Sequence, residues 1–137
     1  MKVTQLTAFL ENRSGRLAEV ADILGAAGIN IRGFSTTEAA EYGIVRLIVT
    51  DPEKARQLLH DAGFTTHFSQ VVCVRVFDEP GGLARVLNEL AVAGVSIDYL
   101  DSISFEYICF ALRDVDRAVE LLEGKVEMLS DEEVLAL

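Results

Sequence analysis

The side chains best placed for chemistry in this sequence belong to a polar turn near the N-terminus and to one residue further along. The turn consists of Asn12, Arg13, Ser14 and Gly15, and the later residue is Asn30. An asparagine amide donates through nitrogen and accepts through oxygen, so each asparagine could hold either end of a zwitterion. A helix that begins at the turn adds backbone N–H groups and a partial positive charge, which favour a carboxylate. The pattern favours binding of a small zwitterion, a task that needs no catalyst.

A purely structural interpretation of the same turn stays open. Asn12 and Ser14 would then only cap the helix, each contributing about 1 kcal/mol. Gly15 would serve only the turn. Both interpretations place a helix immediately after the turn.

The segment that begins at this turn occurs twice in the chain. Residues 15–31 align with residues 81–97 without a gap, and eight of the seventeen positions are identical. About one or two identities are expected by chance at ordinary composition. The chain is therefore a duplication with an offset of 66 residues. The identical pairs are Gly15/Gly81, Leu17/Leu83, Ala18/Ala84, Val20/Val86, Leu24/Leu90, Ala27/Ala93, Gly28/Gly94 and Ile31/Ile97.

Hydrophobic periodicity gives the same order of elements in both copies. Alternating residues predict first strands, and apolar residues at helical spacing predict helices that end at Gly28 and Gly94. A strand hairpin, a second helix and a short fourth strand follow. The predicted strands cover residues 5–10, 29–36, 42–49 and 64–68, then 71–76, 96–103, 107–114 and 126–129. The second helices are predicted over residues 52–63 and 115–124. In the first helices the expected buried faces are Leu17, Val20, Ala21, Leu24 and Ala27, and Leu83, Val86, Leu87, Leu90 and Ala93.

These elements predict an α+β fold of two ferredoxin-like βαββαβ units, residues 1–68 and 69–137. Each antiparallel sheet would carry both helices on one face, which leaves the other face and the edge strands in need of partners. The sheets could pair within one chain or between two, and we favour a homodimer. Residues 132–137 align with residues 71–76, so we expect one extra strand at the C-terminus.

Charge and composition exclude several functions. The net charge is −10, and residues 70–137 hold 14 acidic and 5 basic residues, which repel phosphate backbones and argue against nucleic-acid binding. The N-terminus does not resemble a signal peptide, and no apolar run approaches the ~20 residues of a membrane span, so we expect a cytoplasmic protein that does not enter membranes. Cys73 and Cys109 lie in apolar runs and are expected to be buried reduced thiols, with a bridge or redox role as the alternative. His60 and His67 have no partners at ligand spacing, so we expect neither metal nor cofactor.

The combination of the turn, the helix and the following AGINI or AGVSI segment resembles the ACT domain family of regulatory amino-acid-binding modules. The resemblance covers nearly the whole chain as a tandem pair with no attached enzyme. It implies that a free amino acid binds at the interface between two ACT units, using the turn after the first strand of one unit and the start of the second strand. Serine-binding members carry a histidine two residues before the turn asparagine, where this sequence has Leu10, which argues against serine.

The resemblance and the turn chemistry together give a set of candidate ligand-binding residues. In the second copy Asp78 replaces Asn12 and Ser96 replaces Asn30, so a carboxylate at position 78 would favour an ammonium and repel a carboxylate. The two copies should therefore bind differently. The candidates are Asn12, Arg13, Ser14, Gly15, Arg16, Leu17, Ile29 and Asn30 in the first copy, and Asp78, Gly81, Gly82, Leu83 and Ser96 in the second.

Other functions fit the sequence less well. The turn lacks GxGxxG and GK[ST] phosphate signatures, no CxxC favours metal transfer, and the open sheet face offers few aromatic or basic residues for RNA. Asp98, Asp101 and Glu106 lack a nearby nucleophile, so an enzyme is not expected. We expect a sensor whose ligand stabilises one arrangement of units that a partner enzyme or regulator reads. The remaining alternative is a ligand-free ACT pair that only assembles with an enzyme or transcriptional regulator.

Overall fold

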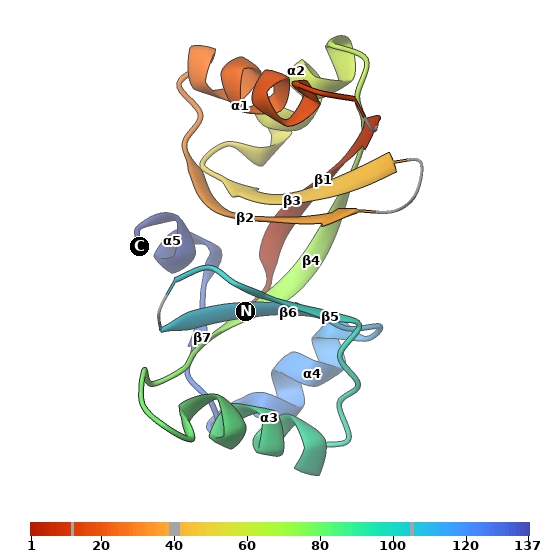
Figure 1. Cartoon of the computed structure of the whole chain (residues 1–137). Helices are drawn as coiled ribbons and strands as arrows, with labels where there is room; N and C mark the ends of the chain where they lie inside the picture. The colour runs from red at the N-terminus through yellow and green to blue at the C-terminus, as the bar shows by residue number, and fades with distance from the viewer. Residues whose placement is uncertain (12, 39–41, 105) are drawn as a thin grey trace. The chain divides into compact units, whose positions relative to one another are not determined.

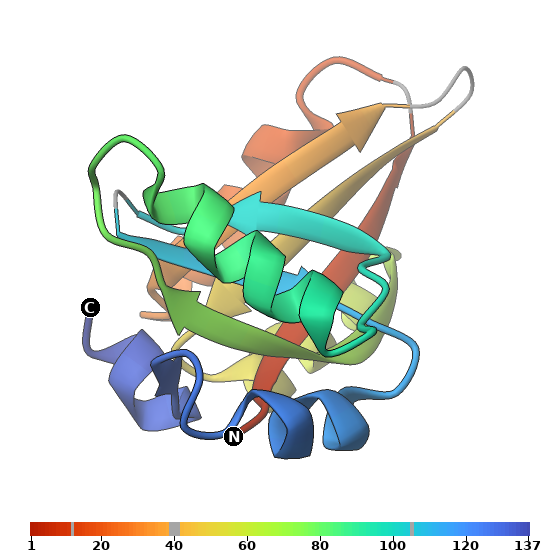
Figure 2. The same ribbon diagram turned by 90° about the horizontal axis from the view of Figure 1, so that it is seen from below.

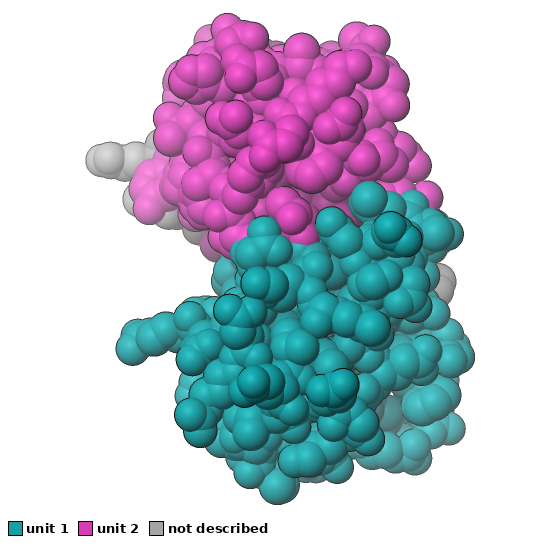
Figure 3. All heavy atoms as spheres, turned by 180° about the vertical axis from the view of Figure 1, so that it is seen from behind, with its two compact units in different colours: residues 1–3, 70–137 teal, residues 4–69 magenta. Residues whose placement is uncertain are grey.

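The computed structural model describes residues 1–11, 13–38, 42–104 and 106–137, so the predicted site residue Asn12 lies outside the described residues. The chain divides into two compact units, coloured magenta and teal in Figure 3. The N-unit, magenta, comprises Thr4–Ser69. The C-unit, teal, comprises Gln70–Leu137 together with Met1–Val3.

The N-unit has the predicted order of elements, β1-α1-β2-β3-α2-β4 (Figure 1). Its strand β3 pairs antiparallel with both β1 and β2, and the strand order is β2-β3-β1-β4. The elements are β1 Val3–Glu11, α1 Arg16–Ala26, β2 Ile31–Glu38, β3 Tyr42–Val49, α2 Pro52–Asp61 and β4 Thr65–Arg75.

The C-unit repeats this arrangement with the second half of β4 as its first strand. Strand β6 pairs antiparallel with β4 and β5, and β7 pairs with β4 on its other side, which gives the order β7-β4-β6-β5. The further elements are α3 Gly82–Val92, β5 Tyr99–Ser102, β6 Tyr107–Ala111, α4 Val115–Leu122, β7 Met128–Leu129 and α5 Asp131–Leu135.

Both units place their two main helices on one face of the sheet. In the C-unit, α3 and α4 lie on the same side of the strands in Figure 1, and Figure 2 shows α3 crossing β5 and β6. The C-unit strand order corresponds position by position to the N-unit order β4-β1-β3-β2. The predicted α+β class with two ferredoxin-like βαββαβ units is confirmed.

A separate apolar core fills the space between sheet and helices in each unit. In the N-unit, residues from all four strands and both helices contribute; in the C-unit, the core draws on β4, β6 and both main helices. Burying such side chains is the main favourable term in folding. The fully buried members include Leu6, Leu24, Val45 and Leu59 in the N-unit, and Val72, Val74, Phe110 and Leu122 in the C-unit.

The apolar faces predicted for the first helices are wrong at two positions in the first copy, Leu17 and Ala21, and at Leu83 in the second, all of which are exposed. Leu17 and Leu83 are 46% and 43% exposed. The buried stripe of α1 is instead Arg16, Val20 and Leu24, which are spaced by four residues. Because a helix turns once per 3.6 residues, neighbouring residues point about 100° apart. Leu17, one residue after Arg16, therefore points away from the buried stripe.

The two short strands predicted over residues 64–68 and 71–76 form one continuous strand, β4, of 11 residues. Ser69 and Gln70 connect them without a glycine or proline, so nothing in the sequence turns the chain there. The strand therefore serves as the last strand of the N-unit and the first strand of the C-unit.

The extra strand predicted over residues 132–137 is wrong, because this segment forms the short helix α5. Ser130 and Glu133 form a capping box: the Glu133 N–H donates to the Ser130 hydroxyl and the Ser130 N–H donates to the Glu133 carboxylate. Acidic residues in the first turn also favour a helix start. The local Ser-x-x-Glu pattern outweighs the weak alignment with the first strand.

Both cysteines are buried free thiols, as the sequence predicts. They lie opposite each other in the antiparallel β4–β6 pair. A hydrogen bond with Cys109 and burial raise the pKa of the Cys73 thiol well above its usual value. Across the described part of the chain, no helix is long and apolar enough to span a membrane, and no group of three His, Cys, Asp or Glu side chains could hold a metal ion.

Candidate functional site

The turn between β1 and α1 ends in a glycine immediately before the helix. Gly15 precedes α1 and adopts φ +86°, a left-handed conformation that glycine tolerates without strain. The Arg13 N–H donates to the Glu11 carbonyl (2.7 Å) and the Arg16 N–H to the Arg13 carbonyl (3.4 Å). Among the described residues no side chain caps the start of α1, so the cap interpretation is wrong for Ser14.

The turn between β4 and α3 has the same construction. Gly81 adopts φ +84° before α3, and no side chain in the described part of the chain caps this helix either. The Glu79 N–H donates to the Phe77 carbonyl and the Gly82 N–H to the Glu79 carbonyl, both at 2.9 Å. These bonds match those of the first turn with an offset of 66 residues, so the duplication preserves the backbone geometry as well as the sequence.

The helices outside these two turns begin differently. In α2, α4 and α5 an Asp or Ser side chain accepts a hydrogen bond from a first-turn backbone N–H; the caps are Asp51, Asp114 and Ser130. Helices α1 and α3 instead leave N–H groups of their first turns without a side-chain acceptor within the described chain. Such helix starts attract carboxylates and other anions.

Arg16, a predicted ligand-binding residue, is packed inside the N-unit. Its guanidinium carbon lies 4.0 Å from the centroid of the Phe64 ring, and Nη1 is 2.5 Å from a Glu19 carboxylate oxygen. The residue is only 8% exposed. The charge of Arg16 is therefore compensated within its own unit, whereas Arg13 and Leu17 face solvent at the turn.

The corresponding turn of the C-unit borders a cavity of about 440 Å³. Asp78 and Leu83 line it together with Phe77 and with Leu100 on β5. Gly82, also a predicted site residue, has a structural reason to be glycine: a Cβ at this buried position would overlap the Phe77 carbonyl oxygen. The turn thus brings Asp78, Gly81 and Leu83 together at one end of the sheet.

Residues Ile29 and Asn30 lie just after α1, at a corner that hydrogen bonds close. Ile29 is buried, whereas Asn30 is exposed. The Asn30 N–H donates to Thr50 Oγ1 and the Thr50 N–H donates to the Asn30 carbonyl, both at 3.0 Å. Lys54 Nζ donates to the Ala27 carbonyl at 3.5 Å. The fold uses the Asn30 backbone, which leaves its side-chain amide on the surface.

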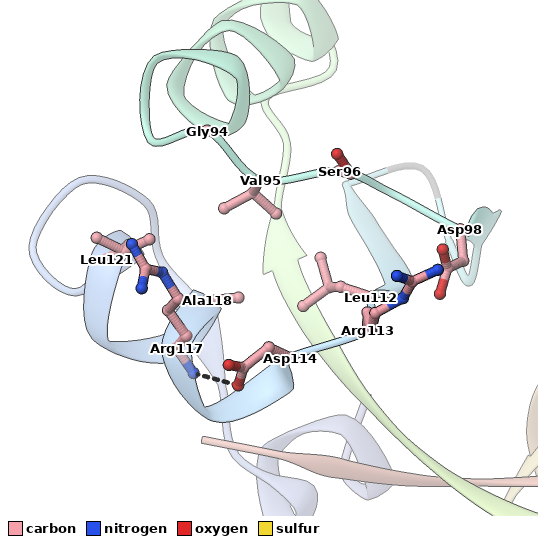
Figure 4. A pocket seen from close by; sticks show the side chains of 10 residues that line it. All are labelled: Gly94, Val95, Ser96, Asp98, Leu112, Arg113, Asp114, Arg117, Ala118 and Leu121. Atoms are coloured by element: carbon pink, nitrogen blue, oxygen red, sulfur yellow. Dashed lines mark hydrogen bonds between the residues drawn. The ribbon is translucent and has the colours of Figure 1, made fainter.

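The equivalent corner of the C-unit is open. Ser96 lines a cavity of about 370 Å³ whose other polar residues are Asp98, Arg113, Asp114 and Arg117. In Figure 4 the side chains of Val95, Leu112 and Ala118 point toward one another between these polar groups. The cavity therefore has an apolar floor and a charged rim.

The structure does not bring the two parts of the predicted site together within one unit. In the N-unit the turn residues lie at the start of α1 and Asn30 follows its end. An 11-residue helix is about 16 Å long at 1.5 Å per residue. The same separation divides Asp78 from Ser96 across α3. A site that uses both parts therefore needs two units.

Sequence reasoning missed Arg113 and Arg117, although the repeat contains the signal for them. Extending the alignment through the second helices with an offset of 63 places Thr50 over Arg113 and Lys54 over Arg117. The neighbouring Asp51 and Asp114 are identical and cap their helices in the same way. A gained positive charge on one side of the shared cap and a guanidinium in place of an ammonium on the other mark a corner whose chemistry differs between the copies.

A comparison with protein-family models decides the family. The model described as ACT domain pair matches residues 1–137. This chain is an ACT domain pair. The match agrees with the two βαββαβ units and with the duplicated turn.

Solved structures similar to this ACT domain pair fall into two groups. Protein BT0572 from Bacteroides thetaiotaomicron is 37% identical with a TM-score of 0.93, over 100% of this chain and 98% of that one. The ligand-free regulatory subunit of aspartate kinase from Thermus thermophilus is 15% identical with a TM-score of 0.64, over 89% and 91% of the two chains. A third, the regulatory subunit of aspartate kinase from Thermus flavus, is 12% identical with a TM-score of 0.60, over 91% and 94%. The two aspartate kinase structures share the fold. No curated protein matches the sequence.

Proposed function

We propose that this ACT domain pair is a regulatory sensor that binds a free amino acid and performs no catalysis of its own. The observation that carries the proposal is the pair of helix starts at Gly15 and Gly81, which no described side chain caps. Both preserve the same turn, and both offer backbone N–H groups to a ligand carboxylate. The ligand ammonium would bind the side chain of Asn30, or of Ser96, from the second-strand start of another unit.

The route from binding to regulation follows from the separation of the two half-sites. Because one unit cannot supply both, a ligand that touches a turn and a strand start favours the arrangement of units that brings them together. A partner enzyme or regulator that recognises this arrangement would respond to the amino acid. The two buried free thiols support a reducing compartment such as the cytoplasm.

The test is a thermal-shift screen of the chain against the twenty amino acids, followed by titration of every hit. A ligand that binds the folded state raises the apparent stability with its concentration. We expect at least one amino acid to raise the midpoint temperature of unfolding at a ligand concentration below about 10 mM, which is of the order expected for weak sites. The absence of any shift would contradict the proposal and favour the assembly module that binds no ligand.

A matched pair of variants then tests the helix start. Leu17 is exposed in the first turn of α1, so Leu17→Glu places a carboxylate beside the open N–H groups, where it competes with the ligand. We expect Leu17→Glu to weaken binding about tenfold while Leu17→Gln leaves it within about twofold. Asn30→Ala should also weaken binding, since the fold uses only the Asn30 backbone. If all three variants bind the amino acid as tightly as the unaltered chain, the N-unit turn and Asn30 are not part of the ligand-binding site.

Exposed apolar residues at matched positions support assembly into a homodimer, whether or not a ligand binds. Phe34 on β2 and Leu100 on β5 are 69% and 37% exposed, and they occupy equivalent places in the two copies. Each belongs to a strand with one hydrogen-bonded neighbour among the described strands. Exposed apolar residues on edge strands mark interaction surfaces. Light scattering of Phe34→Lys against the unaltered chain tests this: a monomeric variant supports a β2 interface, and an unchanged mass contradicts it.

A further inference from the structure

We propose that the cavity beside Ser96 binds an acidic α-amino acid, a ligand with two carboxylates and one ammonium. The inference rests on the proposed function in taking an amino acid as the ligand, and adds a chemical class and further residues. It concerns the C-unit alone, because all residues that line the cavity belong to that unit. The volume of about 370 Å³ falls within the range typical of small-molecule sites.

Two guanidinium groups on the rim of this cavity have no carboxylate partner. Among the described residues, neither Arg113 nor Arg117 forms an ion pair or a side-chain hydrogen bond, although the chain has many more acids than bases. Other arginines do form ion pairs: Arg13, Arg16, Arg56, Arg75 and Arg85. A guanidinium binds a carboxylate through two parallel hydrogen bonds. The cavity therefore offers separate positions for two ligand carboxylates.

Of the two carboxylates in the cavity, one has both oxygens without a partner in the described chain, and the other has one oxygen bound. Asp114 caps α4, where its Oδ1 accepts from the Arg117 backbone N–H at 3.1 Å (Figure 4). Asp98 uses its backbone N–H, which donates to the Ala111 carbonyl at 2.8 Å, while its carboxylate has no partner within the described chain. The groups without any partner in the described chain are thus two guanidinium groups, the Asp98 carboxylate and the Ser96 hydroxyl. They complement two carboxylates and one ammonium.

In the N-unit, hydrogen bonds join the elements at the equivalent corner. There Thr50 stands in place of Arg113 and bonds to the Asn30 backbone, and Lys54 stands in place of Arg117 and donates to the Ala27 carbonyl. In the C-unit, both replacements are arginines, and neither makes the corresponding backbone bond within the described residues. The corner loses local hydrogen bonds and gains two free guanidinium groups, a change that a ligand-binding role explains.

The charge pattern selects among amino acids. A neutral amino acid leaves one guanidinium without an anion, and a basic side chain brings a third cation to the pair. An acidic side chain occupies both guanidinium groups at once, and the Val95, Leu112 and Ala118 floor accommodates its methylenes. A dicarboxylate without an ammonium would leave Asp98 unpaired beside the ligand, which costs affinity through charge repulsion.

Calorimetric titration of the full chain with L-glutamate, L-aspartate, their amides and glutarate tests the assignment. We expect an acidic amino acid to bind about tenfold more tightly than its amide and more tightly than glutarate. The double substitution Arg113→Thr with Arg117→Lys installs the N-unit residues and should abolish this preference. Arg85→Thr removes an equal charge from exposed α3 and should preserve it. Asp98→Asn should weaken the binding of glutamate, whereas the affinity for glutarate should stay the same or increase.

The outcomes separate this inference from the proposed function. If amino acids bind without preference for acidic ones, or the acidic preference survives the double substitution, the inference is wrong and the proposed function stands. If inorganic phosphate outcompetes glutamate at this cavity, the site is an anion site and the assigned ligand class is wrong. If no amino acid binds, both fail. The unfolding midpoint of each variant is measured in parallel without ligand and must match that of the unaltered chain within a few degrees. If the double variant is less stable than this, the single variants Arg113→Thr and Arg117→Lys are used in its place.

Discussion

The guanidinium of Arg16 lies over the ring of Phe64, with 4.0 Å between its central carbon and the ring centroid. Arg16 joins the first turn of α1 to the residue that precedes β4, and its charge is balanced by Glu19. The corresponding residue of the C-unit is Gly82, which has no side chain to pack at this corner. The duplicated units therefore share a backbone but stabilise this corner in different ways.

Substituting Arg16 by methionine should lower the free energy of unfolding by about 1–2 kcal/mol, because the stacked and partly desolvated cation is lost while the aliphatic stem remains. Urea denaturation of the full chain measures the change. Arg13→Met is the matched control: its side chain is largely exposed and 3.7 Å from the same Glu19, so about 0.5 kcal/mol or less is expected. Equal effects of both substitutions would contradict the structural role of Arg16.

Gly82→Ala should destabilise the protein by about 1–3 kcal/mol, because its Cβ would overlap the Phe77 carbonyl oxygen and force the turn to move. Gly25→Ala provides the control within α1. A Cβ there meets nothing within 4 Å, and alanine is the better helix former, so this variant should gain about 0.5–1 kcal/mol. Opposite shifts of the thermal midpoint are the expected result, and destabilisation of similar size by both variants would be inconsistent with the turn geometry.

Asp51→Ala should cost about 1 kcal/mol, because the Asp51 carboxylate accepts from the Lys54 N–H at the start of α2. Ser14→Ala should change the unfolding free energy by less than about 0.3 kcal/mol, since α1 has no side-chain cap within the described chain. Chemical denaturation of the two single variants compares them directly. A loss of about 1 kcal/mol for Ser14→Ala would restore the helix-cap interpretation of the turn.

The cysteine pair makes stability depend on alkaline pH. A hydrogen bond with Cys109 and burial raise the pKa of Cys73 above its ordinary value of 9.0, so the folded state keeps the proton where the unfolded state loses it. Stability from this group is complete below about pH 9 and falls as pH rises above it, by at most about 1.4 kcal/mol per pH unit. Unfolding curves between pH 7 and pH 10.5, a range that brackets the thiol titration, measure the slope. Cys73→Ala should show a shallower decline, and an identical slope would exclude Cys73 as its cause.

Much of the fold could be predicted because its signals are local and occur twice. Alternating apolar residues predict the strand β1, and the match between the copies predicts both glycine turns from residue types alone. The predicted C-terminal strand failed although the sequence contains the evidence against it, since Ser130 and Glu133 form a capping box that specifies a helix start. The exposure of Leu17 could not be predicted, because the phase of a buried stripe depends on the sheet against which the helix packs.

The sequence by itself determined the duplication, the order of elements and the glycine turns that begin α1 and α3, because each follows from residue types at fixed spacing along the chain. Only the tertiary structure decided what these positions do. It placed Arg16 on Phe64 inside a unit, separated Gly15 from Asn30 by the length of α1, and brought Ser96 together with Arg113 and Arg117. The physical reason is that a binding corner is made by residues distant in sequence, whose approach is set by the packing of helices on the sheet.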